Sequence, residues 1–303
     1  SGSTLRWLSN GTKDYEAPND ADTNNTYIVT VRATDTAGNH TDQTITATVT
    51  DVAEYSAEAT ALFARMTSQP DASRKTLIDT LVTTLKSAGI WAKLDCLYLT
   101  AAHDAQAARL NWIQSNFNLT TVNSPTFTVD RGYKGDGTGA YLQGSYTPAA
   151  NGVTFQQNSA HTGIWNNTAG QDNGVEMGND NSAFSMRNTI NNSTNRVNAG
   201  TGITISGVTG TMVGHFAASR TSATDMAIYQ EASVFASSAA SASSANSSIA
   251  IIMLARRAAT TGNVQQYTSR QQAAYHIGAG LSPTEITNFR NALYTYLHAI
   301  GAA

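Results

Sequence analysis

Acidic side chains are the first candidates for chemistry, because glycoside hydrolysis needs two carboxylates across one bond, about 5 Å or ~6.5–9.5 Å apart. On a single β-strand they would alternate as E-x-D-x-E, and the 303-residue sequence has no such triplet. Glu176 lies between Val175 and Met177, so on a strand it would point opposite to them, across a concave face. The acids between residues 119 and 303 are few: Asp130, Asp136, Asp172, Glu176, Asp180, Asp225, Glu231 and Glu285.

Metal and nucleophile chemistry also lack their usual spacings. The six histidines form neither HxH nor HExxH, and no G-x-S-x-G or P-loop is present. His215 and His276 fall in segments that we expect to be strands, so we expect both side chains to be packed or to lie at a sheet edge. The single cysteine, Cys96, excludes an intrachain disulfide, and its apolar neighbours predict a buried, inert thiol.

Ligand recognition has a softer pattern, because sugar rings dock on aromatic faces while amide, carboxylate and backbone groups fix their hydroxyls. The candidates for such a site are Tyr133, Asp136, Tyr141, Tyr146, Trp165, Asn166 and Asn167. Ile164 alternates with Trp165, so we expect one of the two in the core and the other exposed. The alternative is that Trp165 and the tyrosines complete the core.

Composition narrows the class of protein. Charged residues make up only 13%, and the net charge of −3 predicts no attraction to nucleic acid or to an anionic membrane. No apolar run approaches the ~20 residues that span a bilayer. Few charges, 23 glycines and many Thr and Asn residues are typical of a β-rich extracellular or virion protein.

The C-terminal stretch from Gly214 to Leu297 predicts strands followed by one helix. Ser282, Pro283 and Glu285 form the capping box S-P-T-E at the start of that helix. Apolar residues then recur at helical spacing, at Ile286, Phe289, Leu293, Leu297 and Ile300. The Ser/Ala-rich run at 236–248 predicts a mobile loop between strands.

Residues 119–257 have the pattern of short β-strands, because alternating apolar pairs are separated by Gly and Asn turns. The pairs are Phe127 and Val129, Val153 and Phe155, Val175 and Met177, Phe184 and Met186, and Ile203 and Ile205. Many short strands at this spacing favour a sandwich or a jelly roll.

Three segments resemble the concanavalin A-like (laminin G-like) modules of tailed-phage and prophage virion proteins. They are RGYKGDGTGAYLQGSY at 131–146, the strand end AIYQ at 227–230, and IGAGLS before the final helix. The helical run at 73–111 looks like the segment that precedes such modules. The resemblance covers residues 56–303 and implies a mainly β jelly-roll fold that binds surface glycan.

The first 52 residues predict two alternating strands, over 26–33 and 44–50, joined by the turn DTAGN. This block resembles the second half of a cadherin-like repeat, which implies an Ig-like β segment. The resemblance also implies that Asp14, Glu16, Asp35 and Asp51 bind calcium, a metal that takes six to eight oxygen ligands. The alternative is that these acids are solvated turn residues.

Residues 56–113 predict a small helical connector. One helix has Leu77, Ile78, Leu81, Val82 and Leu85 on one face, with Asp71 or Ser73 as cap and Gly89 as stop. Shorter helices are expected around 62–66 and over 104–112. We expect the apolar face of the connector to pack against the sandwich.

Together, these features predict a partial cadherin-like segment at 1–53, a helical connector at 54–116, and a concanavalin A-like sandwich with a C-terminal helix at 117–303. The favoured function is a non-catalytic recognition module at a virion or cell surface. Its partners would be a host glycan or protein and other virion proteins, and a homo-oligomer such as a trimer is compatible. The alternatives are a structural spacer or oligomerisation domain without ligand and, third, a polysaccharide hydrolase.

Overall fold

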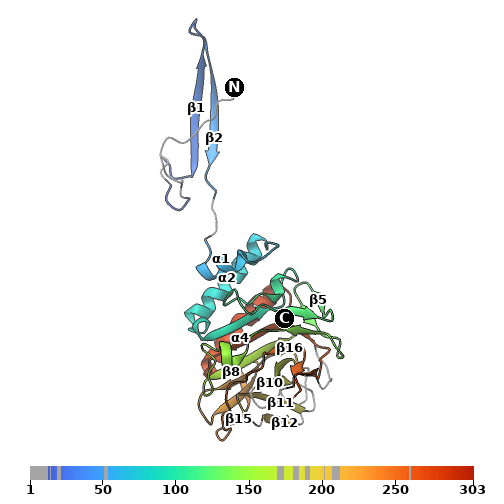
Figure 1. The fold of residues 1–303 in the computed structure, drawn as a ribbon. Coiled ribbons are helices and arrows are strands. Elements are labelled where there is room, and N and C mark those ends of the chain that lie inside the picture. Colours follow the sequence, from blue (N-terminus) through green and yellow to red (C-terminus); the bar gives the residue numbers. More distant parts are fainter. Residues whose placement is uncertain are drawn as a thin grey trace. The chain divides into compact units, whose positions relative to one another are not determined.

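The computed structural model of the chain divides into two compact units, Ser1–Glu54 and Tyr55–Ala303. It describes residues 13, 15–18, 22–50, 54–168, 174–179, 184–187, 192–200, 202–206, 212–258 and 261–303. Within these ranges, no helix has the length and apolarity required to cross a bilayer. The chain and its two units can be followed in Figure 1.

The first unit contains the predicted hairpin. Strands β1 (Thr26–Thr34) and β2 (His40–Thr48) pair antiparallel, with Val29 opposite Ile45. Alternation places the side chains of such a pair on one face, yet Val29 remains 36% exposed. A two-stranded sheet is marginal alone, so this hairpin gains little from its own apolar burial.

The second unit is a β-sandwich, which confirms the predicted mainly β fold. Its first sheet, here the helix-covered sheet, has the order β15-β14-β13-β8-β19-β6-β5 in the described residues, and β3 also pairs with β19. The strands are β3 (Leu94–Leu99), β5 (Thr126–Thr128), β6 (Gly132–Lys134), β8 (Ala160–Asn166), β13 (Gly214–Arg220), β14 (Met226–Gln230), β15 (Ser233–Ser238) and β19 (Gln271–Gly278).

The second sheet, here the facing sheet, has the order β12-β11-β10-β9-β16-β7-β4, with β17 and β18 attached at β9. Its strands are β4 (Thr120–Val122), β7 (Tyr141–Gln143), β9 (Met177–Asn179), β10 (Phe184–Arg187), β11 (Asn192–Val197), β12 (Ile203–Ser206), β16 (Ile252–Met253), β17 (Arg256–Arg257) and β18 (Val264–Gln265). Arg220 of β13 donates its Nε–H to the Val197 carbonyl of β11, at 3.1 Å, and so links the two sheets.

The described part of the second unit also contains helices, of which the last, Pro283–Ala299, covers the outer face of the helix-covered sheet (Figure 1). They are α1 (Ala57–Phe63), α2 (Ala72–Ser87), the short α3 (Pro148–Asn151) and α4 (Pro283–Ala299), with 3-10 turns η1 (Trp91–Lys93) and η2 (Ala107–Arg109). The capping box predicted at Ser282 and Glu285 is present, and Asp71 caps α2 by accepting from the Arg74 N–H. Most of the apolar stripe of each of α2 and α4 is buried, and Leu77 and Ile300 are half-buried. Helix α2 packs against α4, and Phe289 of α4 packs against His276 of the sandwich.

Three local predictions need correction. The connector is not separate from the sandwich, because residues 94–99 form β3 and pair with β19. The helix expected over 104–112 is reduced to the 3-10 turn η2. Residues 153–155 form no strand, because their backbone N–H groups bind the Asp95 carboxylate instead.

The Ser/Ala-rich run at 236–248 is held in place rather than left loose. Its first residues belong to β15, and the Ser241 N–H donates to the Thr224 carbonyl at 2.9 Å. Arg220 donates to the Ser241 carbonyl, and Asn198 donates to the Asn246 side chain. The run has little apolar surface to bury, so polar contacts from neighbouring strands supply its order.

Candidate functional site

Two of the predicted ligand-binding tyrosines are buried in the sandwich. Tyr133 is 2% exposed and donates its hydroxyl to the Ala105 carbonyl at 3.0 Å. Tyr146 is 1% exposed and donates to Asp95 Oδ2 at 2.7 Å. The alternative interpretation, that these rings complete the core, fits their positions.

Trp165, Asn166 and Asn167 are also buried, at the end of β8. Asn166 Oδ1 accepts from the Gln272 side chain, and Asn167 donates Nδ2–H to the Arg131 carbonyl at 2.8 Å. Ile164 and Trp165 do point to opposite sides, but both are covered. The expectation of one exposed side chain does not hold, because α4 lies over the outer face of the sheet.

The remaining two candidates lie together at the surface. Tyr141 is half-buried on β7 and its ring lies 6.2 Å, centroid to centroid, from the ring of Tyr267, with the planes inclined by 52°. Leu142 between Tyr141 and Gln143 is fully buried, so the two flanking side chains lie on the face turned away from the core. Tyr267 donates its hydroxyl to the Val264 carbonyl at 3.0 Å, which fixes its ring.

Asp136 borders this tyrosine pair on the exposed turn before β7. Its Oδ1 accepts hydrogen bonds from three backbone N–H groups, those of Thr138, Gly139 and Ala140, each at 2.8 Å. These bonds stabilise the ionised form and hold the pKa of Asp136 far below its usual range. Asp136 is therefore a fixed negative charge at any physiological pH.

A cation and an amide complete the surface. Arg257 of β17 donates Nη2–H to Gln143 Oε1. Partial burial raises the pKa of Tyr267; Tyr141 and Asp136 raise it further, while Arg257 lowers it, so all three act on the same hydroxyl. We call this surface the tyrosine patch, defined as Asp136, Tyr141, Gln143, Arg257 and Tyr267.

Three members of the tyrosine patch escape sequence reasoning. Tyr267 lies in an irregular segment, and Arg257 belongs to a two-residue strand, so neither shows alternation. Gln143 alternates with Tyr141, which is the only signal that could have included it. The pairing of residues 141 and 267 depends on how distant segments meet in the facing sheet.

The described residues give little support to carboxylate catalysis. Glu176 is fully buried and forms an ion pair with the fully buried Arg270, so it does not point across an open face. Asp172 and Asp180 lie outside the described residues. Where the structure is described, no group of three or more His, Cys, Asp or Glu side chains could hold a metal ion.

The predicted calcium ligands are only partly described. Asp14 and Asp51 lie outside the described residues. Asp35 lies in the hairpin turn, where it accepts from the backbone N–H groups of Ala37 and Asn39 and from the Asn39 amide. These bonds lower the pKa of Asp35.

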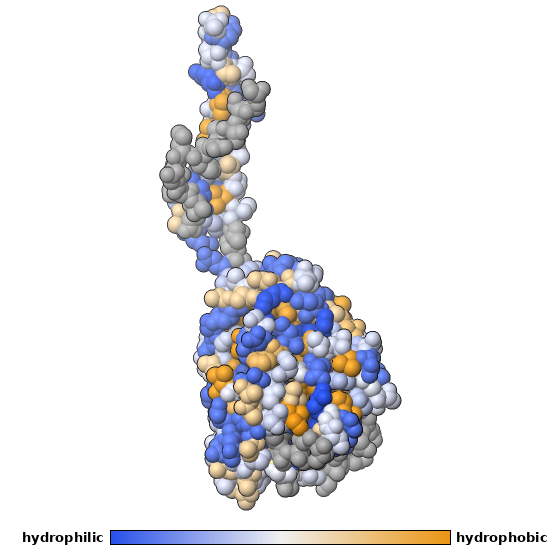
Figure 2. Space-filling view, viewed as in Figure 1, coloured by the Kyte–Doolittle hydropathy of each residue, from blue (hydrophilic) through white to orange (hydrophobic). Residues whose placement is uncertain are grey.

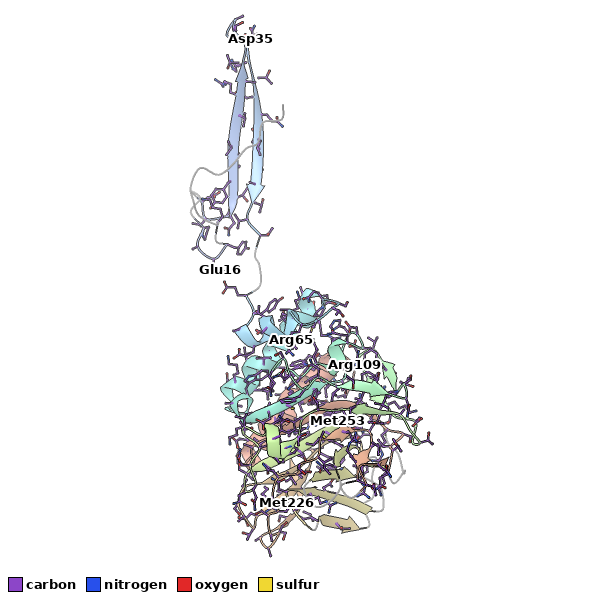
Figure 3. All side chains as sticks on the ribbon, viewed as in Figure 1. Glu16, Asp35, Arg65, Arg109, Met226 and Met253 are labelled. Atoms are coloured by element: carbon purple, nitrogen blue, oxygen red, sulfur yellow. The ribbon has the colours of Figure 1, made fainter. Side chains whose placement is uncertain are left out.

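Glu16 is labelled near the opposite end of the hairpin in Figure 3. Its neighbour Tyr15 accepts a hydrogen bond from Asn25, which immediately precedes β1, whereas Asp35 immediately follows β1. Nine strand residues span roughly 30 Å, so Glu16 and Asp35 cannot share one ion within a hairpin. The calcium site stays a prediction, and Glu16 and Asp35 would not be ligands of the same ion.

The tyrosine patch is a local feature of a mixed surface. On the face of the second unit drawn in Figure 2, hydrophobic residues of the described part lie scattered among hydrophilic ones. A site on such a surface would combine aromatic contact with hydrogen bonding rather than rely on a broad apolar face.

No family model and no curated protein matches the chain. Solved structures to which the chain is similar include the botulinum neurotoxin serotype D binding domain, with a TM-score of 0.48, 8% identity, and coverage of 67% of this chain and 52% of that one. The binding domain of Paraclostridial Mosquitocidal Protein 1 has a TM-score of 0.42, 12% identity, and coverage of 67% and 53%.

A Trypanosoma rangeli sialidase mutant that displays trans-sialidase activity has a TM-score of 0.44, 10% identity, and coverage of 75% of this chain and 40% of that one. The chain thus spans about half the length of these structures, or less. Such low identities and TM-scores transfer neither a ligand nor an activity, and the β-sandwich assignment rests on the strand pairing above.

Proposed function

We propose that residues 55–303 form a non-catalytic recognition module of a phage or prophage virion protein, and that the module binds host surface glycan at the tyrosine patch. The observation that carries this proposal is the half-exposed Tyr141–Tyr267 pair, which is bordered by a carboxylate, an amide and a guanidinium. Sequence resemblance supports the virion context, which includes host glycan and other virion proteins as partners.

The aromatic part of the patch suits the apolar face of a sugar ring. Two tyrosine rings inclined at 52° present contact area from two directions, one from β7 and one from the irregular segment after β18. The Tyr267 hydroxyl is fixed to Val264, so little side-chain freedom is lost on binding. Tyrosine supplies amphipathic contact area, which is the reason for its frequent use at binding surfaces.

The polar part of the patch suits sugar hydroxyls. Asp136 only accepts hydrogen bonds, Arg257 only donates them, and the Gln143 amide can do both. The strong backbone hydrogen bonds to Asp136 hold its carboxylate in one orientation. A ligand with adjacent hydroxyl groups could therefore donate to Asp136 and accept from Arg257, an arrangement that a flat apolar ligand could not use.

The two alternatives have less support among the described residues. An exposed apolar stripe on the helices would favour an oligomerisation domain, but most stripe residues of α2 and α4 are buried, and Leu77 and Ile300 are half-buried. A pair of carboxylates across a groove would favour a hydrolase, but Glu176 is paired with Arg270.

A glycan array with the intact chain tests the proposal. We expect binding to a subset of bacterial surface glycans, and no release of reducing ends on prolonged incubation with the bound glycans. A blank array over a broad set of such glycans would favour the spacer alternative. Release of reducing ends would establish the hydrolase alternative and contradict the proposal.

A further inference from the structure

Three histidines from adjacent strands meet beneath α4. They are His161 of β8, His215 of β13 and His276 of β19, and all three are fully buried. The ring centroid of His276 lies 5.1 Å from that of His161 and 5.2 Å from that of His215. Phe289 of α4 covers the group, with its ring centroid 4.3 Å from that of His276.

Backbone geometry makes room for this cluster. Gly163 of β8 lies directly beneath the His276 ring, and a Cβ there would come within 2.1 Å of its Cε1 and Nε2 atoms. The Gly163 backbone is extended, so the close approach of the ring, and not the conformation, requires a glycine at this position.

The hydrogen bond between His215 and His276 requires that one of these two rings be neutral. His215 Nε2 and His276 Nε2 lie 2.9 Å apart, so one of them must donate and the other accept. His161 Nδ1 contacts the Ala279 carbonyl, and His215 Nδ1 has a long contact of 3.5 Å with the Glu231 carbonyl. If each Nδ1–H donates to its carbonyl, then His215 Nε2 accepts from His276, and the His215 ring is neutral.

Protonation would break this arrangement. An imidazolium donates from both nitrogens, so protonated His215 could no longer accept from His276. Among the described residues, His161 Nε2 and His276 Nδ1 have no hydrogen-bond partner, so a proton added there would be buried without an acceptor. The cost of such burial is removed only if water reaches the ring.

The charged groups around the cluster do not compensate for added protons. Arg290 of α4 disfavours a charge on His215, and Lys93 disfavours one on His161. Asp95 and Glu285 favour a charge on His161, but neither forms a hydrogen bond to it. The titratable groups that act on His276 are His161 and His215, and each of these opposes its protonation.

Two ion pairs hold α4 at its polar edges. Glu285, in the first turn of α4, pairs with Lys93 at 2.6 Å. Arg290 pairs with Glu231 Oε2 at 2.5 Å, and Glu231 Oε1 accepts from the His215 N–H at 2.8 Å. Both pairs join α4 to neighbouring elements without entering the apolar contact over the histidines.

From this geometry we infer that α4 is an acid-released cover, which leaves the helix-covered sheet when the histidine cluster His161–His215–His276 takes up protons. The opened state places the rings in water and exposes Trp165. In the closed state, that indole lies 5.9 Å from the Arg290 guanidinium and 6.3 Å from the Tyr294 ring. The sandwich itself keeps its strand pairing.

The pH range in which α4 should open follows from the pKa values of the three histidines. Burial lowers the pKa of His161 and of His215 from 6.5 to about 4, and it also lowers that of His276 well below 6.5. Opening restores ordinary pKa values, so the opened state binds more protons between pH 6.5 and 4 and is favoured as pH falls. For each such histidine, the opening equilibrium constant should rise about 20-fold between pH 7 and pH 5.

Glu285 does not account for opening in this window. The Lys93 ion pair and the backbone N–H of Ser282 lower the pKa of Glu285 against the effect of burial, so its carboxylate stays ionised as the histidines titrate. Loss of helix contacts above pH 4.5 would therefore report on the histidines rather than on the Glu285–Lys93 pair.

Hydrogen exchange of the intact chain tests the inference. Protection factors, corrected for the intrinsic pH dependence of exchange, should fall more than tenfold in α4 between pH 7 and pH 5, while those of β13 and β8 change little. The change should reverse on return to pH 7. A uniform loss of protection in α4 and the strands, or no loss in α4, would overturn the inference.

Two variants give the matched comparison. His276→Gln removes the central titratable ring, so α4 protection should depend less on pH. His298→Gln removes an exposed histidine of the same helix and should behave as the unaltered protein. If His276→Gln does not fold, acrylamide quenching of Trp165 fluorescence in the unaltered protein gives a second test, with Trp165→Phe as the blank. Quenching should increase as the pH falls from 6.5 to 4. No increase would contradict the inference.

Discussion

The Tyr146 hydroxyl donates a 2.7 Å hydrogen bond to Asp95 Oδ2 inside the sandwich. The same carboxylate accepts from the backbone N–H groups of Val153, Thr154 and Phe155 and from the Thr154 hydroxyl. Asp95 is 3% exposed, so one buried charge organises a loop that contributes no strand to either sheet. A tyrosine that sequence reasoning assigned to a ligand is thus part of the support for this loop.

We predict that Asp95→Ala lowers the free energy of unfolding by at least about 3 kcal/mol, because it leaves several buried donors without an acceptor. Tyr146→Phe removes a single donor and should cost about 1–2 kcal/mol. Urea unfolding monitored by circular dichroism measures both values. Equal effects of the two substitutions would show that the backbone bonds to Asp95 contribute little.

The buried pair of Glu176 and Arg270 should be more costly to break than to replace. We predict that Glu176→Leu lowers the free energy of unfolding by about 3–5 kcal/mol, because it leaves the Arg270 charge buried without its partner. Glu176→Leu combined with Arg270→Met should recover most of that loss. A double variant less stable than the single one would show that other contacts of Arg270 dominate.

Stability should fall as the solution becomes acidic. Because burial lowers the pKa of His161 and His215 to about 4, the unfolded chain binds more protons than the folded chain between pH 6.5 and 4. The free energy of unfolding should therefore fall with pH by up to about 1.4 kcal/mol per pH unit for each histidine. Chemical unfolding across this range measures the slope of the unfolding free energy against pH. The slope should be smaller in His276→Gln. An unchanged slope would contradict the assignment of the pH dependence to the histidine cluster.

Two glycines in the left-handed region allow a matched test of the contact that anchors α4. Gly214 has a φ of +102°, and a Cβ there would lie 1.8 Å from Glu231 Oε1; Gly262 has a φ of +70° and open space around it. We predict that Gly214→Ala costs at least about 1 kcal/mol more than Gly262→Ala, because only the former displaces Glu231 from Arg290. Thermal unfolding of the two variants measures the difference. Equal losses of stability would mean that backbone strain, and not the displacement of Glu231, causes the effect.

The predictable parts of the fold were those specified by neighbouring residues. The capping box of α4, its buried stripe and the Thr26–Thr48 hairpin depend on local spacing, and all are present. The fate of Trp165 and the histidines depends instead on α4, which is distant in sequence and covers a sheet face that alternation alone would leave to solvent. Strand alternation says which side chains share a face, but it cannot say what lies over that face.

The candidate site shows the same limit. Asp136 and Tyr141 were identified from residue type and lie in the tyrosine patch, whereas Tyr133 and Tyr146, from the same segment, point into the core. Tyr267 joins Tyr141 only through the packing of an irregular segment against β7. Residue type therefore suggests a binding segment, and the fold decides which of its side chains a ligand could reach.

The most direct measurement of the central claim is a calorimetric titration of the intact chain with the strongest ligand from the glycan array. Tyr141→Ala and Tyr267→Ala should each weaken binding at least about tenfold, since stacking on one aromatic ring contributes roughly 1–2 kcal/mol. Tyr294→Ala, an exposed tyrosine of α4 next to Trp165, should leave the affinity unchanged. Unchanged affinity in both patch variants, with loss in Tyr294→Ala, would contradict the tyrosine patch as the binding site.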